Sequence, residues 1–448
     1  MADLSARLDE GWNTVKAGLR LEGKHAGATL SQRFINGTFW CLIGAVGTQG
    51  STLLASVFTA RLLGREVFGQ FSFLQGTVMT AATFTGFGLG LTATRYVAHY
   101  RQEDPQRTGN FIRFVMTIAS AVSALASLLM AVGAPYLAFH VFHLPVLSPC
   151  IRWAAVCLFC ITINGVQTGV LAGFESFRAV AFVNIAKGTT TLFLTVPFIW
   201  LWRLEGAFAA IGAAGAVAYA VSLFQVAAVC KTHGITRTRS MDWSNARVLW
   251  TFSVPTVLAG VLVAPVTWLA SLWLSRQPHG YSELGLFGAA NQWRSALSFI
   301  PAVLSQPLLP LLTSLATGRK RSFDRLVIYS AALNGGTAAV VGVVVVLAFP
   351  LISHVYGRGF AGISSVLVPL TVAGVISCAA NPIGNALASR GRMWLGLILN
   401  LIWAACLLML AGIWIPAAGA RGLAYSFLAA YLVHMLTTGY YVLRSRGA

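Results

Sequence analysis

Residues 393–415 of this 448-residue chain read MWLGLILNLIWAACLLMLAGIWI, a stretch without a single charged side chain. A helix needs about 20 predominantly apolar residues to cross the hydrocarbon core of a bilayer. Because lipid offers no hydrogen-bond partner to the backbone, a continuous apolar run satisfies its own N–H and C=O groups as a helix, whereas barrel strands alternate in polarity. The stretch therefore predicts a membrane-spanning α-helix.

Apolar runs of the same kind recur along the whole chain. Hydrophobic residues make up 57% of it, charged residues 10%, and the mean hydropathy is +0.73, whereas soluble domains carry about a quarter charged residues. We therefore expect an all-α polytopic membrane protein with twelve transmembrane helices. The predicted spans are 39–60, 67–92, 111–133, 151–173, 179–202, 206–230, 248–274, 284–312, 326–350, 362–388, 393–415 and 421–443.

The segment before the first span, residues 1–38, contains acids and bases throughout, which is not typical of a cleavable signal peptide. Its apolar residues recur at helical spacing, namely Leu4, Leu8, Trp12, Val15 and Leu19. This pattern favours an amphipathic helix on the membrane surface, and a solvated cytoplasmic tail is the alternative.

The formal net charge of +19 is distributed as a topology signal. Of the 31 lysines and arginines, all but Arg61, Arg65, Arg152, Arg203, Arg276, Arg294, Arg358 and Arg421 lie in segments on the side of the membrane that the N-terminus occupies. Cytoplasmic loops carry the excess of Lys and Arg, so we expect both termini in the cytoplasm. Since no single basic patch forms, nucleic acid is not an expected partner.

A single constant offset along the sequence relates the two halves of the chain. It pairs Gly69 with Gly285, Phe71 with Phe287, Leu171-Ala172 with Leu387-Ala388, Asn184 with Asn400, and Gly206 with Gly422. Six spans per half give the halves the same orientation. We therefore expect two pseudo-symmetric six-helix lobes around a central cavity, at 39–230 and 248–448, with 231–247 as a cytoplasmic linker.

One stretch carries a family resemblance. Residues 60–69 read ARLLGREVFG, followed by Gly86-Phe87-Gly88 and Arg95-Tyr96, and the second half contains GAANQ at 288–292 and LLP at 308–310. With the twelve-span layout, this pattern resembles the polysaccharide flippases of the multidrug/oligosaccharidyl-lipid/polysaccharide exporter superfamily.

The resemblance implies a multi-pass protein of the bacterial inner membrane. The short outside loops and the scattered cysteines and histidines lead us to expect a protein that is not an enzyme and has no cofactor or metal. The substrate that the resemblance implies is an undecaprenyl-diphosphate-linked oligosaccharide, which moves from the inner to the outer leaflet by alternating access for surface polysaccharide biosynthesis. The other partners it implies are membrane lipids, and a polysaccharide polymerase and chain-length proteins are further candidates. We expect a monomer.

Ionisable residues inside spans are candidates for function, because a charge at mid-helix costs about 2.5 to 3.5 kcal/mol on insertion scales. Arg294 lies about ten residues into its span, beside Asn291 and Gln292. We expect it to bind the diphosphate of the implied substrate, and pairing with a neighbouring span is the structural alternative.

The remaining candidates have equally ordinary alternatives. Arg61 is either a turn anchor, which we favour, or an exit-side phosphate contact. Lys187 either meets incoming diphosphate or extends to the inner headgroups. Gln49 and Gln75 either line the sugar path or bond between helices.

No acidic residue is central in any predicted span. A cation-coupled multidrug antiporter of the same superfamily is the alternative function, and it needs buried carboxylates. A membrane glycan-processing enzyme is the second alternative, and it would need a substantial outside loop for its catalytic groups. Both features are missing from the pattern.

Overall fold

The computed structural model describes residues 30–86, 88–235, 262–305, 308, 312, 320–390 and 393–447, and it contains no β-strand within them. The prediction of an all-α chain is confirmed. Residues 1–29 of the predicted surface segment, most of the linker, the first part of the span at 248–274 and parts of the end of the span at 284–312 lie outside the described residues. Residues 30–38, predicted as part of the surface segment, instead belong to the first helix of the described chain. The helices are α2 (Leu30–Leu63), α3 (Arg65–Gly86), α4 (Leu89–Glu103), α5 (Pro105–Val132), α6 (Ala134–Tyr136), α7 (Ser148–Gly173), α8 (Phe177–Thr232), α11 (Val263–Ser275), α12 (Gly280–Leu297), α13 (Phe299–Ser305), α15 (Lys320–Leu347), α16 (Phe349–Tyr356), α17 (Ser364–Ser389) and α18 (Met393–Gly447), with short π-helical (Leu137–Val141) and 3-10 turns (Pro145–Leu147, Arg358–Phe360).

Seven helices of the described chain are long and apolar enough to cross a membrane. They are Phe39–Leu63, Pro105–Val132, Pro145–Gly173, Phe177–Thr232, Phe323–Leu347, Ser364–Leu387 and Trp394–Tyr440. Two of these, within α8 and α18, are interrupted by residues with non-helical backbone angles. Each of the two therefore contains a pair of predicted spans.

The interruptions in α8 and α18 have the same backbone geometry. Arg203 has φ 50° and ψ −124°, and Gly419 has φ 56° and ψ −130°. Beyond each bend a glycine faces the preceding arm: a Cβ at Gly206 would lie 1.9 Å from the Phe198 carbonyl oxygen, and one at Gly422 would lie 2.0 Å from that of Trp414. All of these pairs are related by the offset that takes Gly69 to Gly285. The spacing of the sequence repeat is thus present in the backbone.

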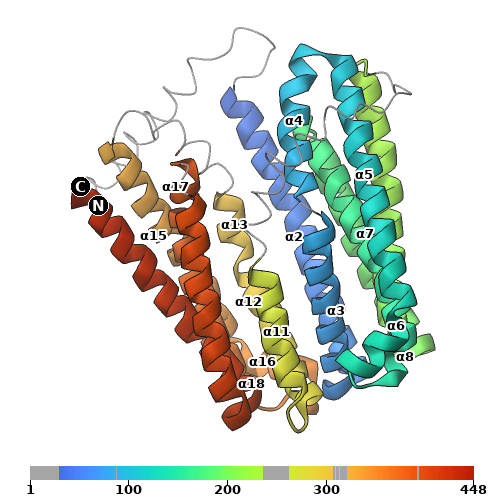
Figure 1. The fold of residues 1–448 in the computed structure, drawn as a ribbon, viewed down its shortest axis with the longest axis vertical. Helices are drawn as coiled ribbons and strands as arrows, with labels where there is room; N and C mark the ends of the chain where they lie inside the picture. Colours follow the sequence, from blue (N-terminus) through green and yellow to red (C-terminus); the bar gives the residue numbers. More distant parts are fainter. Residues whose placement is uncertain are drawn as a thin grey trace.

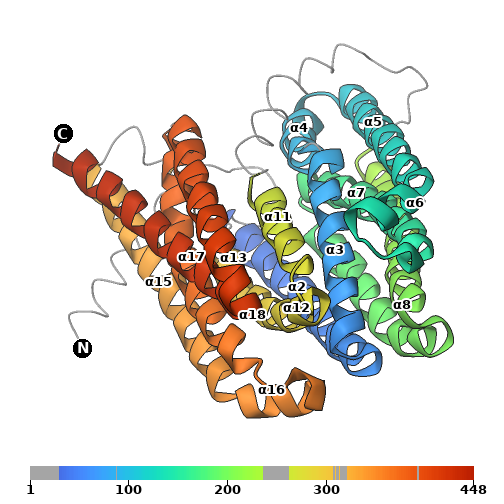
Figure 2. The ribbon, with the colours of Figure 1, turned by 60° about the horizontal axis from the view of Figure 1, so that its bottom comes forward.

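The helices form two groups, which Figures 1 and 2 show side by side. The first group contains α2 to α8 and the second contains α11 to α18. Helix α2 packs along α8, and α7 packs along α5 and α8; α17 packs between α15 and α18. Between the groups, α12 and α11 pack against α3. We call the end of the molecule with the α8 and α18 bends the bend end, at the bottom of Figure 1.

Close helix packing within the first group depends on small residues. A Cβ at Gly169 would lie 2.2 Å from the carbonyl oxygen of Gly90, and one at Gly44 would lie 2.6 Å from the Cα of Ala181. Lipid gives helices no hydrophobic reason to associate, so small residues that let backbones approach supply much of the packing energy.

Candidate substrate site

Helices α3 and α12 meet at the boundary between the two groups. A Cβ at Gly69 would lie 1.7 Å from the carbonyl oxygen of Tyr281, and a Cβ at Gly285 would lie 2.1 Å from that of Arg65. These contacts are reciprocal, because the offset that takes Gly69 to Gly285 also takes Arg65 to Tyr281. The two backbones therefore touch near the bend end, where only glycine fits.

The same two helices are less apolar than their neighbours. With 22 and 18 residues they are long enough, yet neither is among the seven described helices that are apolar enough to span a membrane. Polar residues in a membrane protein face other helices or an interior cavity. The central position of α3 and α12 provides that surrounding (Figure 2).

Arg294 on α12 lies inside the second group. Its Nε donates a 2.8 Å hydrogen bond to Oδ1 of Asn291. Its guanidinium carbon lies 5.8 Å from the ring centroid of Phe427 on α18, and its side-chain carbons pack against Gly374 on α17. The side chain is half-buried and forms no ion pair within the described part of the chain. An amide and an aromatic ring orient the guanidinium while its other donors remain available.

Lys187 lies inside the first group, on the arm of α8 that precedes the bend. Cys157 and Cys160 lie near it on α7, which packs along α8. The next residue, Gly188, packs on α2, because a Cβ there would lie 3.0 Å from the Cα of Thr48. Lys187 is half-buried, and no described residue bonds or pairs with its ammonium.

The other predicted site residues are dispersed. Arg61 is exposed at the bend end, where its Nη1 donates a 3.4 Å hydrogen bond to the carbonyl oxygen of Val355 on α16. Gln49, Gln75 and Gln292 are half-buried. Of the predicted residues, the described structure joins Arg294 and Asn291 directly and connects no others by a hydrogen bond or ion pair.

Sequence reasoning missed an ion pair between the groups. Arg65 Nη2 lies 2.5 Å from Oε1 of Glu283, and Arg65 Nε donates to the Ser282 carbonyl oxygen at 2.8 Å. Both ionised residues lie just outside predicted spans, where charges are ordinary. The available signal was the offset, which takes Arg65 to Tyr281, close to Glu283 in the sequence.

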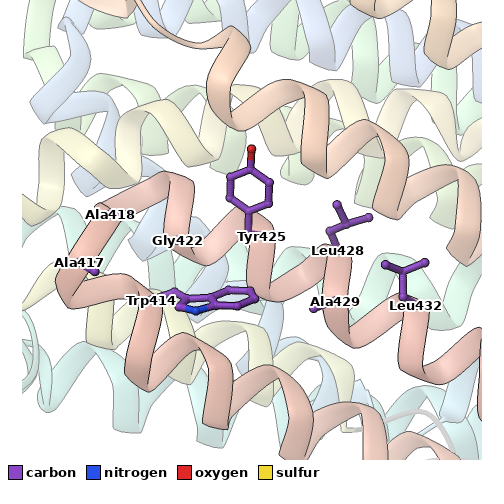
Figure 3. Close-up of a pocket in the computed structure, with 8 residues that line it drawn as sticks. All are labelled: Trp414, Ala417, Ala418, Gly422, Tyr425, Leu428, Ala429 and Leu432. Carbon is purple, nitrogen blue, oxygen red and sulfur yellow. The ribbon is translucent and has the colours of Figure 1, made fainter.

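A groove of about 430 Å³ lies between the two arms of α18 (Figure 3). Trp414 and Tyr425 form part of its walls, and Gly422 and three alanines leave the space between them. None of the described residues that line it is charged. The groove can accept an apolar chain but offers nothing to a phosphate, so it is a different kind of site from that around Arg294.

Comparison with known proteins agrees with this architecture. A family model described as "Polysaccharide biosynthesis protein" matches residues 34–316. A relative from Ralstonia nicotianae, the EPS I polysaccharide export inner membrane protein EpsE, is 25% identical over 376 residues, covering 81% of this chain and 82% of the relative.

Solved structures share the fold at low sequence identity. An inward-facing multidrug resistance MATE family transporter of the MOP superfamily has a TM-score of 0.71 at 13% identity, over 92% of this chain and 99% of the other. The lipid II flippase MurJ in an inward closed conformation has a TM-score of 0.68 at 13% identity, over 91% of this chain and 87% of the other. Since the family model matches more than half of the chain, the resemblance seen at residues 60–69 is confirmed: this chain belongs to the polysaccharide biosynthesis protein family.

Proposed function

We propose that this protein moves an undecaprenyl-diphosphate-linked oligosaccharide from the inner to the outer leaflet of a bacterial inner membrane by alternating access. Family membership supports it, as does the similarity to an inner membrane protein of polysaccharide export. The fold shared with the lipid II flippase MurJ is compatible with such a large lipid-linked substrate.

The proposed architecture has twelve spans in two six-helix lobes, 39–230 and 248–448, with both termini in the cytoplasm and the bend end outside. The matching bends in α8 and α18 support this count, because each divides one long helix into two spans. The outside position of the bend end rests on the positive-inside rule. The protein acts as a monomer in this proposal.

The environment of Arg294 is the observation that supports this function best. A half-buried guanidinium without a carboxylate partner among the described residues is costly in a membrane. Such a charge is expected either to bind an anion or to serve another function. The planar guanidinium binds phosphate oxygens through two parallel hydrogen bonds. In the proposal Asn291 orients Arg294, Gln292 lies beside it, Lys187 meets the diphosphate on entry and Arg61 on exit. Gln49 and Gln75 contact the sugars.

The driving force follows from the charge of the substrate. Moving one elementary charge across 100 mV is worth about 2.3 kcal/mol, so a diphosphate of about −2 leaving an inside-negative cell gains roughly 4 to 5 kcal/mol. Outward movement then needs no coupling carboxylate.

The acids nearest the lipid in the predicted layout are Glu175 and Glu283, and both are paired with arginines, Arg101 and Arg65. Because both carboxylates are engaged by arginines, they disfavour a cation-coupled antiporter, which needs a free carboxylate. The multidrug transporters among the solved structures share the fold at 13% identity, which does not extend to the substrate.

Complementation tests the role of Arg294. In a flippase-null strain, Arg294→Ala expressed at the normal level should restore less than about a tenth of the surface polysaccharide, because a charged hydrogen bond is worth about 1.5 to 3 kcal/mol. Arg294→Lys, which keeps the charge but loses the paired donors, should restore an intermediate amount. Full restoration by Arg294→Ala would overturn the assignment.

Two assays of the purified protein separate the alternatives. Binding of organic cations without binding of undecaprenyl diphosphates would favour a multidrug antiporter. Chemical turnover of a lipid-linked sugar would favour a glycan-processing enzyme. The proposal predicts undecaprenyl diphosphate binding and neither of these results.

A further inference from the structure

The carboxylate of Glu283 connects three helices at the bend end. Its Oε1 accepts from Arg65 at the start of α3, and its Oε2 accepts a 2.9 Å hydrogen bond from the backbone N–H of Ala420, at the bend of α18. Arg65 in turn holds α12 a second time, through the Ser282 carbonyl oxygen. Both oxygens of Glu283 are therefore engaged, one by each group of helices.

The described structure contains two other ion pairs between side chains, and both lie within a group. Arg101 and Glu175 join α4 to the end of α7 in the first group. Arg390 and Asp324 are 3.7 Å apart and join residues beside α17 and in α15 of the second group. A relative movement of the groups leaves these two pairs intact but pulls Arg65 away from Glu283.

The surroundings of Glu283 leave little room for other arrangements. A Cβ at Gly419, which has φ 56°, would lie 2.7 Å from Oε2 of Glu283. Beside it, the reciprocal contacts of Gly69 and Gly285 bring α3 and α12 together at backbone distance. The Glu283 carboxylate thus links helices at a place where the backbones of α3 and α12 are in contact. That contact exists only while the two groups are together.

Glu283 and Arg294 act on the same two helices. Eleven residues, or about 16 Å at the helical rise, separate them along α12. On α18, Ala420 bonded to Glu283 and Phe427 beneath the Arg294 guanidinium are seven residues apart, or about 10 Å. A ligand that displaces Arg294 would therefore also shift α12 and α18, the helices that carry Glu283 and its partner Ala420.

We propose that the Arg65–Glu283 pair, with the Ala420 N–H, is a latch that holds the two groups together at the bend end, and that its opening is required for substrate release there. The inference rests on the proposed alternating access. The side chains are 24% and 27% exposed, so water can reach both ions once the groups part. The pair then biases the equilibrium between closed and open states without locking it.

Distance measurement across the bend end tests the latch. Spin labels introduced as unnatural amino acids at Val146 in the first group and Leu351 in the second, both exposed, leave the native cysteines in place. Double electron–electron resonance in lipid nanodiscs without substrate then reports the separation of the groups. Arg65→Ala and Glu283→Ala should each raise the long-distance fraction, on the order of threefold for a partly exposed pair.

The control is Asp324→Ala, which removes an ion pair of similar exposure within one group and should leave the distance distribution unchanged. The exchange Arg65→Glu with Glu283→Arg should move the distribution back toward that of the wild type. A distribution in folded Arg65→Ala and Glu283→Ala that matches the control would overturn the latch. Because no substrate is present, failure of lipid-linked sugar transport in a separate assay would be a failure of the proposed function alone.

Discussion

The two groups of helices agree in their backbones and differ in their interior charges. The bends at Arg203 and Gly419 have the same geometry, and Gly69 and Gly285 make reciprocal contacts. The offset that pairs these positions takes Arg294 to Val78 and Lys187 to Trp403, and both of these are buried. Repetition therefore specifies the scaffold. The two departures from repetition, Arg294 and Lys187, are the residues that the proposed function assigns to the diphosphate.

The largest loss of function is expected from substitutions at the two reciprocal glycines, where the halves agree most closely. In Gly69→Ala and in Gly285→Ala the new methyl group would lie 1.7 Å and 2.1 Å from a backbone carbonyl oxygen, so α3 and α12 must separate. We expect each variant to lose more than about tenfold in polysaccharide complementation, and the two losses to be similar. Gly76→Ala in the same helix α3, where nothing lies within 4 Å, is the matched control and should stay near wild type. Unequal losses in the two glycine variants would contradict the pseudo-symmetry.

Substitution of Lys187, the interior charge of the first group, should have smaller effects, which are opposite in sign for stability and for transport. Lys187 has no bonded partner among the described residues, so Lys187→Met removes an uncompensated charge and should raise the melting temperature in detergent by a few degrees. If Lys187 meets the incoming diphosphate, transport should fall by about threefold in the same variant. A gain in stability with unchanged transport would exclude Lys187 from the substrate path. The control Lys231→Met, exposed at the end of α8, should change neither quantity.

The smallest effect is expected at the paired bends. The backbone at Arg203 is strained, because its angles of φ 50° and ψ −124° lie in a region that only glycine adopts readily. Arg203→Gly should therefore stabilise the protein by about 1 kcal/mol, a shift of about 1 to 2 °C in a chain of this size. Gly419→Ala should destabilise it at least as much, since the new methyl group also meets Glu283. Thermal unfolding followed by fluorescence measures both. Opposite signs are the expected result, and a loss of stability in Arg203→Gly would refute the strain.

Much of the fold follows from sequence because its determinants are local. Continuous apolar runs in water-free surroundings specify helices, and the run at 393–415 lies within α18 as predicted. The offset of the repeat was also readable, because turns and close contacts need glycine at fixed places. The seven long helices fall within the predicted layout. The spans predicted at 67–92 and 284–312 correspond to the less apolar helices α3 and α12, which end earlier, at Gly86 and Leu297.

The site was only partly predictable. Arg294 was recognisable because a charge deep in a span is rare, but nothing near it in sequence indicates Phe427 as its neighbour. The pair of Arg65 and Glu283 was not recognisable, since charges at span ends are ordinary and their partners depend on how two distant hairpins meet. Tertiary contacts between helices in opposite halves of the chain have no local signature.

The outward movement of a lipid-linked sugar can be measured as translocation in proteoliposomes. The substrate is a fluorescent undecaprenyl-diphosphate oligosaccharide, and its arrival in the opposite leaflet is followed by a membrane-impermeant quencher with and without an imposed potential. We expect movement that requires the protein, accelerates when the departure side is negative, and falls more than about tenfold in Arg294→Ala. Movement no faster than in protein-free liposomes, or undiminished in Arg294→Ala, would contradict the proposed function.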